Sequence, residues 1–198
     1  MKNPEFKELL KRYFGHESLR AGQADVIDRV LDGVNTLAVL PTGGGKSLCY
    51  QFPALCMDGL SIVVSPLIAL MRDQVDGLIK KGVPALRLDS TTSSEDRDDA
   101  LQQIESGHLK LLYLSPERLA EPTLLKILKR RPISLVAVDE AHCISEWGHS
   151  FRPSYIKLPK LVKSLKPEVI LALTATASKV TANGIRKAFG ILKRDHVQ

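Results

Sequence analysis

The sequence predicts an α/β fold in which a mostly parallel sheet is covered by helices on both faces, giving three layers. Short apolar runs alternate along the chain with amphipathic stretches at helical spacing, which is typical of repeated β-α units. The apolar runs are continuous, as expected for strands that are buried on both faces. Polar segments follow these runs, so we expect them to meet at the carboxyl edge of the sheet, where such folds bind ligands.

Composition favours a globular intracellular protein. The chain has 198 residues, of which 44% are hydrophobic and 25% charged, which suggests one domain with a sizeable core. The net charge of +6 favours a polyanionic partner such as nucleic acid. Three cysteines without metal-type spacing indicate free thiols in a reducing compartment. We see neither an apolar run long enough to cross a membrane nor a signal-peptide pattern, so we expect no membrane partner.

Each element follows from its local pattern. Strands are expected at residues 36–40, 61–65, 85–88, 111–114, 135–138 and 169–173. Helices are expected at residues 5–13, 22–31, from the end of a glycine loop to about 55, and at 67–82, 93–106, 123–129, 158–165 and 178–189. We expect residues 1–33 to form N-terminal helices that pack on a domain of residues 34–198.

A phosphate-binding loop is expected between the first strand and the helix after it. The apolar run ends at Pro41 and is followed by Thr42, Gly43, Gly44, Gly45, Lys46 and Ser47. Glycines let successive backbone N–H groups point at an anion, and the helix start adds its dipole. Lys46 is expected to reach the outer phosphates and Ser47 to bind Mg²⁺. Leu40 replaces the first glycine of the usual pattern, and a turn that binds nothing is the alternative.

Two carboxylates follow the strand at residues 135–138. Phosphoryl transfer needs a metal and an oriented water. We therefore expect Asp139 to hold Mg²⁺ and Glu140 to polarise the attacking water as general base. An acidic pair without catalytic function is the alternative. The Lys46 ammonium and these two carboxylates are expected at neighbouring strand ends, close enough to share one triphosphate and its metal.

With His142, residues 139–142 read Asp-Glu-Ala-His, and here the chain resembles a known family. Nearly its whole length resembles the first RecA-like motor domain of superfamily-2 helicases, above all the RecQ family of DNA helicases. Besides the glycine loop and the acidic motif, the resemblance rests on Ser65-Pro66-Leu67, Ser115-Pro116-Glu117-Arg118 and Thr174-Ala175-Thr176, in the family's order. It implies a RecA-like P-loop NTPase fold, ATP and Mg²⁺ as cofactors, single-stranded or partly duplex DNA as partner, and 3′-to-5′ unwinding in repair and recombination.

Residues 14–23 resemble the adenine-recognition motif of RecQ proteins. The amide of Gln23 can match the N6 and N7 edge of adenine. The resemblance implies that Arg20 contacts the base or a phosphate and that His16 stacks on the base. Leu19 and His16 depart from the phenylalanine and tyrosine that are usual there. An ordinary polar helix residue is the alternative for Gln23.

Residues 142–153 resemble the aromatic-rich loop of RecQ proteins. Trp147 and Phe151 are expected to stack on unpaired bases, unless they anchor the loop to the core. Ser150 replaces an aspartate common in the family. Thr174 and Thr176 are expected to link the nucleotide and DNA sites through His142. The residues assigned to DNA contact or coupling are Ser65, Pro66, Arg118, Trp147, His149, Phe151, Arg152, Thr174 and Thr176.

The resemblance implies further domains in the parent chain, namely a second RecA-like domain with the arginine finger, a zinc-binding region and a winged helix. We therefore expect these residues alone to bind nucleotide weakly and to unwind DNA poorly. Two alternatives stay open, an RNA helicase and a non-motor module that holds nucleotide and DNA. The expected location is the nucleoid-associated cytoplasm of a prokaryote or the nucleus of a eukaryote.

Overall fold

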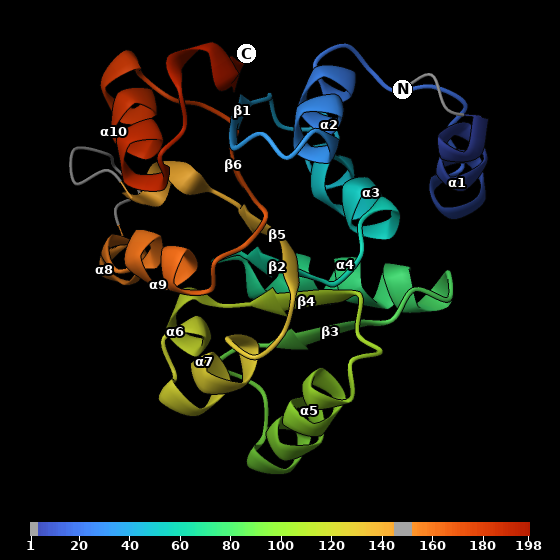
Figure 1. Ribbon diagram of the computed structural model, residues 1–198, viewed down its shortest axis with the longest axis vertical. Helices are drawn as coiled ribbons and strands as arrows, with labels where there is room; N and C mark the ends of the chain where they lie inside the picture. Colours follow the sequence, from blue (N-terminus) through green and yellow to red (C-terminus); the bar gives the residue numbers. More distant parts are fainter. Residues whose placement is uncertain (1–3, 145–151) are drawn as a thin grey trace.

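A single parallel sheet forms the centre of the computed structural model, which describes residues 4–144 and 152–198 (Figure 1). Its strands are β1 (Thr36–Val39), β2 (Leu60–Val64), β3 (Ala85–Leu88), β4 (Leu111–Leu114), β5 (Ile133–Val138), β6 (Val169–Thr174) and β7 (His196–Val197). They are ordered β3-β4-β2-β5-β6-β1-β7, and each neighbouring pair is parallel. The predicted three-layer α/β architecture is confirmed.

Helices cover both faces of the sheet because successive residues of each strand point to opposite sides. One face packs on α2 (Gln23–Leu31), α3 (Leu48–Cys56) and α4 (Ile68–Lys80). The other packs on α5 (Ser94–Ser106), α6 (Pro116–Leu119), α7 (Pro122–Leu128), α8 (Pro153–Ile156), α9 (Leu158–Ser164) and α10 (Lys179–Phe189). In β1, Ala38 joins the first of these cores while Leu37 and Val39 join the second.

A smaller apolar cluster joins the N-terminal helices to the layer on the first face. Helix α1 (Pro4–Phe14) buries Leu10 against Ile27 of α2 and Phe52 of α3. The rings of Phe6 and Phe14 meet Phe52 edge-on, with centroids 6.0 and 6.3 Å apart. The division of the chain into N-terminal helices at residues 1–33 and a domain of residues 34–198 stays a prediction.

Five short elements were missing from the sequence prediction, namely β7, α6, α8 and the 3₁₀ helices η1 (Ala141–Ile144) and η2 (Lys193–Asp195). Strand β7 adds two residues beside β1, with His196 opposite Leu37. Helices α6 and α8 are single turns that begin at Pro116 and Pro153, where no helix was predicted. A helix of a single turn is too short to show helical periodicity, and the two residues of β7 are too few to mark an apolar run.

The polar segments meet at the carboxyl edge of the sheet, as expected. Leu40 N donates to Thr174 O at 3.1 Å, and Asp139 N donates to Val64 O at 2.9 Å. However, β1 and β5 both pair with β6, so their ends are separated by one strand. The expectation of neighbouring strand ends was therefore wrong, because a later strand, β6, inserts between them. In the described residues, no helix combines the length and apolarity needed to cross a membrane.

Candidate nucleotide-binding site

The glycine loop connects the end of β1 to the start of α3. Gly43 and Gly45 have positive φ angles of 77° and 71°, a backbone conformation that glycine adopts without steric cost. A tight turn is closed where Gly44 N donates to Pro41 O at 2.9 Å. Lys46 Nζ lies 3.3 Å from Leu40 O and 3.4 Å from Pro41 O, so the ammonium is held by carbonyls at the base of its own loop.

Gln23 ties the N-terminal motif to this loop. Its side chain donates from Nε2 to Gly44 O and Gly45 O, both at 3.1 Å, and Oε1 accepts from Arg20 N at 2.8 Å. Arg20 Nη1 donates to Gly43 O at 2.6 Å. Both amide protons of the buried Gln23 are thus used by the loop. Its recognition of adenine stays a prediction, and the structure adds a contact that the sequence did not suggest.

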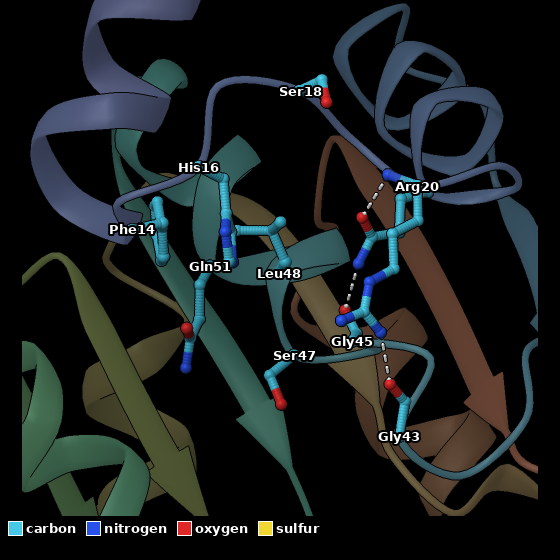
Figure 2. A pocket seen from close by; sticks show the side chains of 10 residues that line it. Phe14, His16, Ser18, Arg20, Gly43, Gly45, Ser47, Leu48 and Gln51 are labelled. Atoms are coloured by element: carbon cyan, nitrogen blue, oxygen red, sulfur yellow. Dashed lines mark hydrogen bonds between the residues drawn. The ribbon is translucent and has the colours of Figure 1, made fainter.

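A pocket of about 300 Å³ lies between these two segments (Figure 2). In Figure 2, Phe14 and His16 lie on one side, Arg20 and Gly43 on the other, and Ser47 between them. The lining residues are Phe14, His16, Ser18, Arg20, Gln23, Gly43, Gly45, Ser47, Leu48 and Gln51. The pocket thus brings residues 16–23 together with the glycine loop, which lies further along the sequence, as the assignment to one nucleotide requires. Thr42, Gly44 and Lys46 belong to the loop but do not line this pocket.

Four lining residues were not assigned to the site from the sequence. Phe14 ends α1, and Ser18 precedes Arg20 in the connecting segment. Leu48 begins α3, and Gln51 lies on α3 one turn after Ser47. For Gln51 the available signal was its helical spacing from Ser47, because residues four apart share a helix face. Phe14 and Ser18 lie within the motif at residues 14–23.

Asp139 is a buried carboxylate at the end of β5, with 5% of its surface exposed. Oδ1 accepts from Glu140 N at 3.0 Å and Oδ2 from Ser65 Oγ at 3.3 Å, while Tyr155 Oη donates to Asp139 O at 2.9 Å. Burial raises the pKa of Asp139 and the Glu140 carboxylate raises it further, whereas the Lys46 ammonium lowers it. Within residues 4–144 and 152–198, no Lys or Arg forms an ion pair with this carboxylate.

This carboxylate and the Ser47 hydroxyl suit a hard cation such as Mg²⁺, which prefers oxygen ligands. A buried carboxylate whose pKa is raised, and which forms no ion pair with the described lysines and arginines, carries the charge that such an ion compensates. Ser47 Oγ accepts from Gln74 Nε2 of α4 at 3.0 Å. The described part of the chain has no group of three or more His, Cys, Asp or Glu side chains that would form a separate metal centre.

His142 joins the ends of β5 and β6. Its Nδ1 lies 2.9 Å from Thr174 Oγ1 and 3.2 Å from Glu140 Oε2. Thr174 Oγ1 donates its only proton to Thr176 O at 2.9 Å, so His142 Nδ1 must carry the proton of the bond to Thr174. Glu140 has a φ of 48°, a left-handed backbone conformation that residues other than glycine rarely adopt and that occurs at functional sites. The structure therefore brings the predicted general base Glu140, His142, Thr174 and Thr176 into one network.

The residues assigned to DNA contact are in different situations. Arg118 Nε donates to Asp89 O at 2.8 Å, and its Nη1 pairs with Glu121, so this guanidinium is engaged within the molecule. Arg152 is the N-cap residue of α8, and its backbone N donates to Cys143 O at 3.2 Å. Pro66 is partly exposed beside the buried Ser65. Trp147, His149 and Phe151 lie outside the described residues, and the DNA assignments stay predictions.

Comparison with known proteins decides the family. Residues 20–183 match the family described as DEAD/DEAH box helicase. The chain belongs to the DEAD/DEAH box helicase family. Within this helicase domain, residues 139–142 form the Asp-Glu-Ala-His box itself.

The curated relatives of this DEAD/DEAH box domain are RecQ-like. The chain is 46% identical over 185 residues to the ATP-dependent DNA helicase RecQ of Haemophilus influenzae, and the match covers 93% of this chain and 30% of that protein. The chain is 49% identical over 182 residues to the probable ATP-dependent DNA helicase RecS of Bacillus subtilis, and this match covers 91% of this chain and 36% of that protein. The resemblance inferred from the motifs is confirmed. The chain spans about a third of the length of these relatives.

Solved helicase structures share the fold of this domain. The DUF1998 helicase MrfA, bound to DNA and AMPPNP, superposes with a TM-score of 0.74 at 20% identity over 99% of this chain and 29% of that one. A hypothetical ATP-dependent RNA helicase from Sulfolobus tokodaii gives 0.72 at 19% identity, over 94% and 55%. The predicted RecA-like fold is confirmed.

Proposed function

We propose that this chain is the N-terminal ATP-binding half of a RecQ-type DNA helicase. ATP hydrolysis by the parent protein would drive 3′-to-5′ movement along DNA and unwinding in repair and recombination. The observation that supports this most is the pocket between the Gln23 motif and the glycine loop, at the same sheet edge as the buried Asp139. Several relatives are named ATP-dependent DNA helicase RecQ, which supports the same activity.

Each residue of the site has a defined task in this proposal. Bound ATP and Mg²⁺ supply the phosphoryl group and the charge that polarises it. The loop N–H groups and Lys46 bind phosphate oxygens, with the ammonium leaving its two carbonyl partners. Ser47 and Asp139 hold the metal through oxygen atoms. Glu140 accepts a proton from the attacking water at a carboxylate oxygen, and His142, whose Nδ1 lies 3.2 Å from Glu140 Oε2, packs beside that carboxylate.

The proposal extends to partners and location. A second RecA-like domain of the same parent chain would complete the ATP site, and single-stranded or partly duplex DNA would bind across both domains. Such a protein would act where DNA is, in the nucleoid of a prokaryote or the nucleus of a eukaryote.

The parent protein provides the test. We expect its ATPase activity to rise with single-stranded DNA, and Lys46→Ala to abolish that activity while Lys187→Ala, an exposed change on α10, leaves it unchanged. Unchanged turnover in Lys46→Ala would remove the phosphate-loop assignment. Strand displacement on RNA but not DNA duplexes would indicate an RNA helicase, and nucleotide binding without DNA-dependent turnover would indicate a non-motor module.

A further inference from the structure

One short segment touches both side chains that the proposed function assigns to Mg²⁺. It runs from Ser65, directly after β2, to Gln74 in α4. At its start, Ser65 Oγ donates to Asp139 Oδ2 at 3.3 Å. At its end, Gln74 Nε2 donates to Ser47 Oγ at 3.0 Å. The two oxygen ligands come from loops after different strands, β1 and β5, which do not pair with each other. This segment is therefore a direct hydrogen-bonded connection between them.

The amide of Gln74 is held in one orientation by a buried tyrosine. Tyr50 Oη donates to Gln74 Oε1 at 2.7 Å. Tyr50 is 1% exposed, and its hydroxyl has one proton, which it donates to this amide oxygen. Because Oε1 faces this donor, Nε2 must face Ser47. Tyr50 lies on α3 three residues after Ser47, and its ring meets Tyr113 of β4 edge-on, 6.3 Å between centroids.

This arrangement orients the Ser47 hydroxyl and leaves one of its acceptor lone pairs available. A serine hydroxyl has one proton and two acceptor lone pairs. Gln74 occupies one lone pair, which leaves the other for a metal ion. A hydroxyl that is already oriented loses less rotational freedom when it binds a metal. On the Asp139 side, Ser65 and Glu140 N bind different carboxylate oxygens and fix the plane of the group in the same way.

We propose that residues 65–74 form a positioning clamp that sets the separation and orientation of the Ser47 hydroxyl and the Asp139 carboxylate. Gln74 and Ser65 are its two positioning residues, and Tyr50 orients Gln74. Mg²⁺ demands near-ideal octahedral geometry, so small displacements of either oxygen weaken its binding. The clamp rests on the proposed function, because it presupposes that Ser47 and Asp139 hold Mg²⁺.

Gln74→Met in the parent protein tests the clamp, since methionine has a similar length but no amide. Gln103→Met, the same change at an exposed position of α5, is the matched control. Binding of a fluorescent ATP analogue is measured over a range of Mg²⁺ concentrations and in EDTA, together with thermal unfolding. We expect the Mg²⁺ concentration for half-maximal binding to rise about tenfold in Gln74→Met, the lower end of the usual effect of an outer-shell partner. Binding in EDTA and the control should stay within about twofold of wild type.

Ser65→Ala and Tyr50→Phe serve as independent variants should Gln74→Met fail to fold. Both are expected to shift the Mg²⁺ curve in the same direction, Tyr50→Phe by less, because Gln74 can still reach Ser47. Mg²⁺ curves that coincide with wild type in all three variants would overturn the clamp. The clamp would also be overturned if a variant lost as much affinity for the ATP analogue in EDTA as in Mg²⁺, because such a residue would have a merely structural role. A wild-type protein that binds no nucleotide at all would instead contradict the proposed function.

Discussion

Replacing Gly45 with alanine tests the contact between the N-terminal motif and the phosphate loop. A Cβ at Gly45 would lie well inside van der Waals contact with Gln23 Nε2. Gly43 offers a matched comparison in the same loop. Its φ of 77° is close to the 71° of Gly45, but a Cβ there meets no atom within 4 Å. The two variants therefore share the backbone penalty and differ in the collision with Gln23.

The expected costs follow from this difference. An L-residue in the left-handed region costs about 1–2 kcal/mol, which applies to both variants. In Gly45→Ala the amide of Gln23 must also move and give up its bonds to Gly44 O and Gly45 O. Gln23 is 4% exposed, so water does not replace those partners, which adds about 1–3 kcal/mol. We expect Gly45→Ala to lose about 2–5 kcal/mol and Gly43→Ala about 1–2 kcal/mol.

Urea unfolding of the chain measures both losses, and thermal unfolding checks them at roughly 2–4 °C per kcal/mol for a chain of this size. The variant Gln23→Ala completes a double-mutant cycle. Without the Gln23 side chain, Gly45→Ala should cost no more than Gly43→Ala. Equal losses for the two glycine variants in the wild-type background would refute the contact, as would an extra cost of Gly45→Ala that persists when Gln23 is absent.

Three further predictions concern the acidic edge. Burial raises the folded-state pKa of Asp139, so ionisation of this carboxylate destabilises the folded protein as pH rises. At neutral pH, Asp139→Asn should therefore unfold at a higher urea concentration than wild type. The variant should lose this advantage below about pH 3.8, where the wild-type carboxyl is uncharged in both the folded and the unfolded state. Tyr155→Phe removes the bond to Asp139 O and should lose about 1 kcal/mol in the same assay, whereas an unchanged midpoint would contradict that bond. Thr174→Val removes the acceptor of His142 Nδ1; we expect DNA-dependent ATP turnover to fall about tenfold, equivalent to about 1.4 kcal/mol, with nucleotide affinity nearly unchanged, and equal losses of both would point to a binding defect instead.

Local pattern was sufficient for most of the sheet. The strands at residues 85–88 and 111–114 have the predicted bounds, and the strand before Asp139 starts two residues earlier than expected. Continuous apolar runs identify such strands because both of their faces are buried. Strand β7 escaped prediction because its two residues are defined by pairing with β1 and carry no periodic pattern.

The chemistry of the candidate site was visible in the residue types, but its hydrogen bonds were not. The sequence indicated that Gln23 has an amide suited to adenine, yet its partners in the structure are carbonyls of the glycine loop. Gln74 gave no signal at all. It lies between the buried Met71 and Val75 on α4, and only the packing of α4 against α3 brings it to Ser47.

The sequence by itself determined the alternation of strands and helices, the phosphate loop, the acidic box and the family, because burial periodicity and short motifs are local properties of a chain. The tertiary structure decided the strand order, which inserts β6 between β1 and β5. It also decided which polar atoms meet across that order, with Lys46 acting on Asp139 and Gln74 bonded to Ser47. Such contacts join residues far apart in the chain, and they exist only once the helices have packed on the sheet.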